Sequence, residues 1–283
     1  MIPLFLHLPK TGGTSFNNCI CDQYYLEDSD SCDDLDPYFK GGVYYFPAGF
    51  FEGQYPPFSE KVLSNLQRED LRAVVGHFAF GIHRFLKRRI NFCYLTLLRH
   101  PRDRIISLYR HLLYFDVPNP ELHQTLVKNE IGLHEFASTF ALPELANDQT
   151  RRVAGIAGPC TRRDLEQAKR RLTDDFAFVG LTERFDESVV LLKRQLGWAQ
   201  PLQYYPANVS RDFEMPIQEP SAEALAAIDA RNSLDLELYQ SAKDAFELRL
   251  ASEAANGLAE EVANFREHNR RMIAKWRKSN VDS

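Results

Sequence analysis

The sequence predicts an α/β protein with a parallel β-sheet that is flanked by helices on both faces. Short apolar runs, of which residues 91–98 (NFCYLTLL) are the clearest, alternate along the chain with segments of helical periodicity. Strands that are apolar on both faces are typical of parallel sheets, since helices cover such sheets on both sides. From residue 221 to the end the pattern is helical, which predicts a helical C-terminal extension.

Each expected strand is an apolar run. The expected strands are residues 2–8, 43–46, 72–77, 91–98 and 176–181. The first is followed by a glycine loop from Pro9 to Gly13. Residues 27–58 are rich in Asp, Gly, Pro and aromatic side chains, so we expect a long irregular excursion around the strand at 43–46. Long loops inside compact domains are often functional.

Each expected helix follows from an amphipathic pattern or a start signal, such as Pro101 at a helix start. The expected helices are residues 14–26, 59–69, 102–115, 119–173 with a break near 142–158, 184–197, and 221–283 with a break at Asn256-Gly257. We see no internal repeat or linker. A single domain over residues 1–283 is therefore expected, with a core of about 1–210 and an extension of about 221–283.

Composition excludes several classes of protein. The 283 residues carry a formal net charge of −5, which argues against a general nucleic-acid partner. The five cysteines match no zinc template, and no metal is expected. The chain shows no signal peptide and no apolar run long enough to span a membrane, so a cytoplasmic protein is expected. The sequence does not set the oligomeric state.

A phosphate site is expected in the first loop. It contains Lys10, Thr11, Gly12, Gly13, Thr14 and Ser15. Glycines let backbone N–H groups turn toward a phosphate, and the start of a helix adds partial positive charge. A Walker A loop has its lysine after the last glycine, whereas Lys10 precedes both. The alternative is a plain tight turn in which Thr14 caps the helix.

A second phosphate site is expected where the strand at 91–98 ends. Arg99 leaves this strand and Ser107 lies on the following helix. An arginine offers a planar fork of donors suited to phosphate, and serine adds a hydroxyl. The alternative for Arg99 is a salt bridge to a carboxylate. Arg104 and Arg110 are interpreted as part of a solvated helix face.

With these two motifs the sequence resembles the sulfotransferases. The branch that it resembles contains heparan sulfate 2-O-sulfotransferase and its bacterial relatives. Further matching segments are Gly76-His77-Phe78, residues 147–151, residues 179–185 and residues 208–210. The resemblance implies a P-loop-NTPase-like fold and the donor 3′-phosphoadenosine 5′-phosphosulfate (PAPS). It also implies a hydroxyl acceptor, most often a saccharide. Animal members are Golgi proteins with an N-terminal anchor, which is not recognisable here.

The resemblance also implies roles for single residues. Residues 11–15 would hold the 5′-phosphate, Arg99 and Ser107 the 3′-phosphate, and a segment with Asn208, Ser210 and Arg211 would close over the nucleotide. Lys10 would stabilise the leaving group. His77 would be the base, with His83 in the same loop as its rival. A groove for the acceptor would be lined by Asn147, Gln149 and Arg151, although Arg151 could equally be a surface charge.

Two other functions fit parts of this pattern. A non-catalytic protein that binds a nucleotide or a glycan could use the same scaffold. A P-loop kinase is a second alternative, which the position of Lys10 disfavours.

Overall fold

The computed structural model describes residues 1–24, 38–46, 59–87, 90–114, 119–204 and 219–281. Its centre is a six-stranded sheet in the order β2-β3-β4-β1-β5-β6. The strands are β1 (Ile2–Leu6), β2 (Phe39–Lys40), β3 (Val43–Phe46), β4 (Ala73–Gly76), β5 (Phe92–Leu98) and β6 (Phe176–Leu181). All neighbours pair in parallel except β2 and β3, which form a hairpin. The predicted parallel sheet is confirmed, apart from the antiparallel β2.

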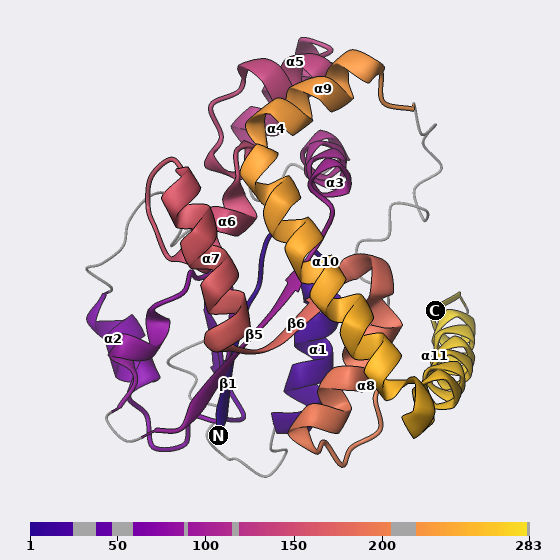
Figure 1. The fold of residues 1–283 in the computed structure, drawn as a ribbon. Coiled ribbons are helices and arrows are strands. Elements are labelled where there is room, and N and C mark those ends of the chain that lie inside the picture. The colour runs from indigo at the N-terminus through magenta and orange to yellow at the C-terminus, as the bar shows by residue number, and fades with distance from the viewer. Residues whose placement is uncertain (25–37, 47–58, 88–89, 115–118, 205–218, 282–283) are drawn as a thin grey trace.

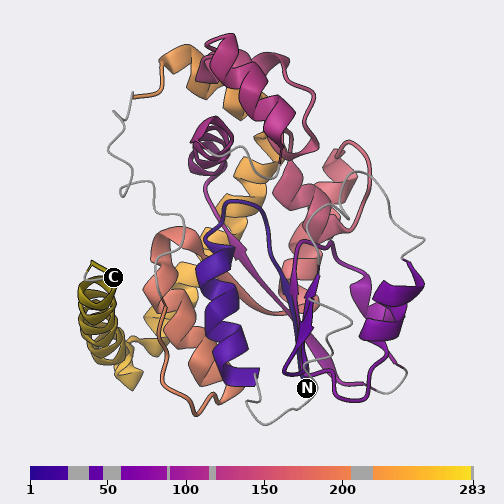
Figure 2. The same cartoon turned by 180° about the vertical axis from the view of Figure 1, so that it is seen from behind.

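Helices cover both faces of the sheet (Figures 1 and 2). The helices are α1 (Gly13–Tyr24), α2 (Glu60–Leu66), α3 (Pro101–Tyr114), α4 (Pro120–Lys128), α5 (Leu133–Thr139), α6 (Asp148–Ala154), α7 (Arg162–Asp174), α8 (Phe185–Leu196), α9 (Ala222–Arg231), α10 (Ser233–Glu253) and α11 (Leu258–Val281). Helices α7 and α10 lie over one face, and α1 lies over the other. No helix among the described residues is both long and apolar enough to cross a membrane.

A second, smaller core lies beyond the carboxyl ends of the strands. It is made by α3, α4, α5 and α9, which form the upper part of Figure 1. Its buried side chains include Leu108, Leu112, Leu126, Phe136 and Ile228. These helices therefore cover the sheet edge at which ligands bind in open α/β folds.

The C-terminal helices are part of the main body. Helix α10 runs across the sheet, and its Leu238 and Phe246 belong to the main core. Helix α11 lies beside α8, where Arg194 pairs with Glu253 at 3.0 Å and with Glu261 at 2.6 Å. The predicted extension is helical, and it completes one face of the sheet.

Helix α6 lies inside the predicted break at 142–158. Asn147, with φ 47°, and Gly155, with φ 62°, adopt left-handed conformations at its two ends. All seven residues of this helix are buried. Five of the seven are polar or charged although they are buried, and so the sequence shows no apolar stripe from which a helix is predicted.

Candidate functional site

Four loops meet at the carboxyl edge of the sheet, following β1, β4, β5 and β6. Arg99 after β5 donates from Nη1 to the carbonyl of Lys10 after β1, at 2.9 Å. The Thr182 hydroxyl after β6 donates to the carbonyl of Thr11 at 2.6 Å. His77 after β4 contacts the carbonyl of His7 through Nδ1 at 2.8 Å. These contacts hold the four loops in one fixed arrangement.

The loop after β1 presents backbone donors at the start of α1. The first hydrogen bond of α1 runs from the Phe16 N–H to the Gly12 carbonyl at 3.3 Å, and the N–H groups of Gly13 and Thr14 precede it. No acidic residue lies in the first turn. The buried Thr11 hydroxyl donates to the Leu8 carbonyl at 2.9 Å, a bond that holds the loop internally. This start of a helix suits an anion.

Lys10 lies in this loop with an unusual backbone and an unusual pKa. Its φ is 66°, a left-handed conformation that is uncommon for residues other than glycine and often occurs at functional sites. Burial, and then the charge of Arg99, lower the pKa of Lys10 to about 8. A bound anion would relieve both effects, because its charge stabilises the ammonium form. The residues present therefore fit a phosphate ester.

Arg99 is the second cation of the site. Burial lowers its pKa, while the carboxylates of Asp103 and Glu183 act in the opposite direction. The charges of Asp103, Arg104 and Arg110 on α3 all act on Arg99. Ser107, which is half-exposed, lies on the same stripe of this helix as Asp103 and Arg110. The assignment of Ser107 to the site of Arg99 stays a prediction.

Two histidines stack beside Lys10. The rings of His7 and His77 have centroids 4.3 Å apart, and burial followed by the charge of Arg152 lowers the pKa of His77 to about 4. A carbonyl only accepts, so His77 Nδ1 carries the hydrogen toward His7 and Nε2 keeps its lone pair. An unprotonated Nε2 is what a general base needs.

The ring of His7 accounts for the presence of a glycine at position 13. A Cβ on Gly13 would lie 1.9 Å from Cδ2 of the His7 ring, so the ring and any larger side chain cannot both fit. The sequence reasoning missed His7, although its position at the end of β1 matches that of His77 at the end of β4.

His83 lies at the other edge of the sheet. Its ring contacts the Tyr94 hydroxyl at 2.9 Å and stacks on Phe92, the first residue of β5. Arg99 follows the last residue of β5, seven residues beyond Phe92, which corresponds to roughly 23 Å along a strand. The choice of His83 as a rival base is therefore wrong.

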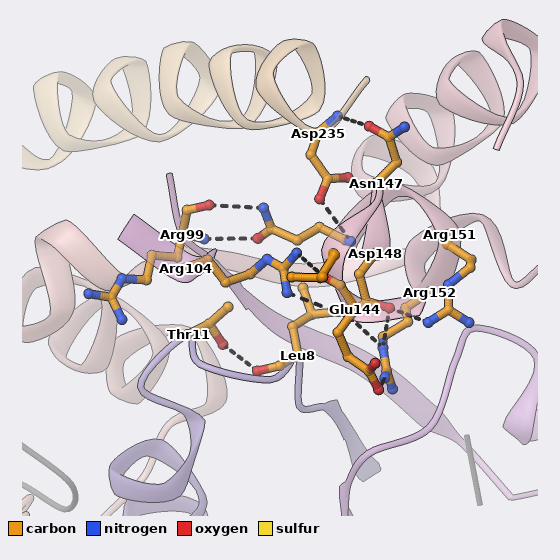
Figure 3. A network of polar contacts seen from close by, with 12 residues as sticks. Leu8, Thr11, Arg99, Arg104, Glu144, Asn147, Asp148, Arg151, Arg152 and Asp235 are labelled. Carbon is orange, nitrogen blue, oxygen red and sulfur yellow. Dashed lines mark hydrogen bonds and ion pairs between the residues drawn. The ribbon is translucent and has the colours of Figure 1, made fainter. Parts of the chain in front are cut away.

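The proposed acceptor groove is also wrong. Gln149 and Arg151 are buried, with exposed fractions of 1% and 6%. Arg151 and Arg152 pair with the buried Asp148, and Asn147 accepts from the backbone of Leu234 at 3.0 Å (Figure 3). The polar groups of these side chains contact other protein groups and do not face an acceptor.

Arg104 is fully buried and is no part of a solvated helix face. It donates to the Glu144 carbonyl at 2.6 Å and lies 3.8 Å from Asp148. Burial alone would raise the pKa of Asp148, but the neighbouring guanidinium groups hold it below its usual value. Three guanidinium groups thus surround one buried carboxylate, with Glu144, a second carboxylate, 4.0 Å from Arg152.

Asn208, Ser210 and Arg211, which were expected to close over a nucleotide, lie outside the described residues. Thr182 lies in the matching segment 179–185, but its contact with Thr11 was not expected, and Asp235 was missed by the sequence reasoning. Each acts on a segment more than 80 positions away, and no local pattern marks such a contact.

The fold and this site define an α/β protein in which two cationic loops meet at the carboxyl edge of the sheet. The model of the Galactose-3-O-sulfotransferase family matches residues 46–278, and the chain belongs to that family.

Curated relatives agree with this membership. Heparan-sulfate 6-O-sulfotransferase 1-B of Danio rerio is 27% identical over 279 residues, which cover 87% of this chain and 66% of the relative. The human heparan-sulfate 6-O-sulfotransferase 1 is 28% identical over 280 residues, with the same coverage. Galactosylceramide sulfotransferase of Mus musculus is 32% identical over 117 residues, or 41% of this chain and 26% of the relative. The chain thus spans less than two thirds of the length of these relatives.

The comparisons bear on two expectations. They show a sulfotransferase family, but the matched family is named for galactose 3-O-sulfation and the relatives above are not 2-O-sulfotransferases by name, so the 2-O-sulfotransferase branch is not shown. The expectation of a cytoplasmic protein is wrong, because it conflicts with relatives of the membrane-anchored Golgi type.

Proposed function

We propose that this protein transfers the sulfuryl group of PAPS to a hydroxyl of a saccharide. The observation that supports the proposal is the meeting of two cationic loops at one sheet edge, where the Arg99 guanidinium donates to the backbone carbonyl of Lys10 at 2.9 Å. Lys10 and the start of α1 would form one phosphate site, and Arg99 with Ser107 would form the other. PAPS is a nucleotide with phosphates at both its 5′ and 3′ positions, and so it matches two such sites.

The donor-binding roles follow from the position of each group. The backbone N–H groups at the start of α1 would bind the 5′-phosphate, since a helix start favours anions. The Arg99 guanidinium and the Ser107 hydroxyl would bind the 3′-phosphate. The loop at residues 9–15 lies outside the range that the family model matches, so its assignment rests on its own geometry.

The chemistry needs a proton acceptor and a stabiliser of negative charge. When bound, the donor supplies an activated sulfuryl group. His77 would take the proton of the acceptor hydroxyl at Nε2, because its Nδ1 hydrogen is held by the His7 carbonyl. Lys10 would neutralise the negative charge that grows on the leaving phosphate oxygen. Removal of one such group typically lowers the rate by about 10²–10³.

The acceptor class comes from the relatives. They are named for heparan sulfate, galactose and galactosylceramide, which all present sugar hydroxyls. A saccharide acceptor is therefore part of the proposal. The finer assignment to the 2-O-sulfotransferase branch stays a proposal that is supported by the motif order and by Gly76-His77-Phe78.

A P-loop-like relation of the fold is proposed as well. It is supported by the place of β1 between β4 and β5 and by the glycine loop that joins β1 to α1. Lys10 precedes the glycines, unlike the lysine of a Walker A loop.

Calorimetric titration tests the donor assignment without knowledge of the acceptor. Adenosine 3′,5′-bisphosphate should bind without added metal and more tightly than ADP or ATP, and Arg99→Ala should weaken it. Lys10→Ala should abolish sulfuryl transfer from labelled PAPS while the protein stays folded. Undiminished transfer in Lys10→Ala would contradict the proposed mechanism. If the wild-type protein binds the bisphosphate but transfers no sulfuryl group, and Lys10→Ala changes only that affinity, the protein is a non-catalytic binding protein.

A further inference from the structure

The side-chain amide of Gln149 holds the backbone of Arg99 from two sides. Its Oε1 accepts from the Arg99 N–H at 3.0 Å, and its Nε2 donates to the Arg99 carbonyl at 2.9 Å (Figure 3). The pairing of β5 with β6 ends one residue earlier, at Leu98 and Leu181. Gln149 thus supplies the donor and the acceptor that a neighbouring strand no longer provides.

Gln149 is itself fixed by the C-terminal helices. The Asp235 carboxylate at the start of α10 accepts from the N–H groups of Gln149 at 3.1 Å and Thr150 at 2.7 Å. In return, the side chain of Asn147 accepts from the N–H groups of Leu234 at 3.0 Å and Asp235 at 3.2 Å. Helices α6 and α10 therefore cap each other, so the first turn of α6 cannot shift without loss of these bonds.

Arg99 is consequently held at both ends. Gln149 sets its backbone, and the Lys10 carbonyl accepts from its guanidinium at 2.9 Å. The direction in which the guanidinium points from the sheet edge depends on both contacts. Because Gln149 is 1% exposed and its whole amide is engaged, no part of it is left to bind a ligand directly.

We infer that Gln149 is a positioning residue that aims Arg99 at the 3′-phosphate of the donor nucleotide. The inference rests on the proposed function, because Arg99 is assigned to that phosphate there. It replaces the acceptor-binding role that the sequence suggested for Gln149. It also gives α10 a part in donor recognition, through Asp235 and the start of α6.

A pair of nucleotides separates positioning from general destabilisation. Adenosine 3′,5′-bisphosphate and adenosine 5′-monophosphate differ only in the 3′-phosphate that Arg99 is assigned to bind. We expect Gln149→Leu to weaken bisphosphate binding at least tenfold and to change monophosphate binding less than twofold, as measured by calorimetry. Gln149→Glu keeps an acceptor for the Arg99 N–H and loses the donor, so it should show the same selective loss if Gln149→Leu does not fold.

Two controls make the outcome decisive. Gln240→Leu removes an exposed glutamine of α10 and should leave both affinities unchanged. In Arg99→Ala, the further change Gln149→Leu should cost no additional bisphosphate affinity, since coupled residues are not additive.

Each failure has its own meaning. A wild-type protein that binds the two nucleotides equally would overturn the assignment of Arg99 and with it the proposed function. If the wild-type protein prefers the bisphosphate, and Arg99→Ala abolishes this preference while both Gln149 variants retain it, only the positioning role is overturned. Equal weakening of both nucleotides in the Gln149 variants would also overturn it, because it would show a merely structural role.

Discussion

Burial of His77 makes the stability of the fold depend on pH in a defined direction. The folded protein holds the pKa of His77 at about 4, whereas an unfolded histidine has a pKa of about 6.5. Between pH 4 and pH 6.5, His77 is therefore protonated in the unfolded chain and neutral in the folded protein. The stabilisation is fully present above pH 6.5 and is lost as the pH falls through the window from 6.5 to 4.

The size of the effect follows from the pKa difference. The shift from 6.5 to about 4 corresponds to about 3 kcal/mol when the pH is below both values. Between pH 7 and pH 4.5, His77 alone should lower the free energy of unfolding by about 2 kcal/mol. In His77→Gln this contribution is absent, and the stability should fall less steeply with acid.

Urea unfolding at pH 7 and pH 4.5 measures this difference in slope. The substitution also changes the packing of a buried ring, so the quantity compared between wild type and His77→Gln is the change of stability with pH. His268→Gln, which removes an exposed histidine of α11, is the matched control and should keep the wild-type slope. If wild type and His77→Gln lose the same stability between the two pH values, the buried neutral histidine pair is refuted.

Two further predictions concern the same edge of the sheet. As the pH increases, kcat/KM should rise through a pKa of about 4, where His77 becomes unprotonated, and fall through a pKa of about 8, where Lys10 loses its charge. Lys10→Arg should remove the fall at high pH. A fall that persists in Lys10→Arg would exclude Lys10 as its origin. Gly13→Ala should destabilise the fold by about 1–3 kcal/mol because its Cβ overlaps the His7 ring. Gly158→Ala, where a Cβ meets nothing within 4 Å, should be close to neutral in the same thermal unfolding experiment.

The sequence predicts the elements whose burial leaves a pattern. The strands β5 and β6 are apolar runs, and their positions are correct to within one residue. Strand β2 has only two residues, which is too short for any alternation to show. Helix α6 was missed for a different reason, since five of its seven buried residues are polar or charged and no apolar stripe marks its turns.

The site could be predicted where a reactive or charged residue directly follows the end of a strand. Lys10 and Arg99 come directly after buried strands, and parallel strands bring such residues to one edge. The same logic excludes His83, because the chain between β4 and β5 must return to the amino edge before β5 begins. Gln149 was misassigned because a polar side chain suggests exposure, and its partners lie 50 and 86 positions away.

The mutual caps of α6 and α10 set an order on the assembly of this protein during its synthesis. The glycine loop after β1 leaves the ribosome early, but Arg99 gains its support only when Asp235 is available. At 5–20 residues per second, the 136 positions between Arg99 and Asp235 take roughly ten seconds to make. Through that interval the nascent chain already carries both loops and the direct bond between Arg99 and Lys10, but not the cap that fixes the first turn of α6.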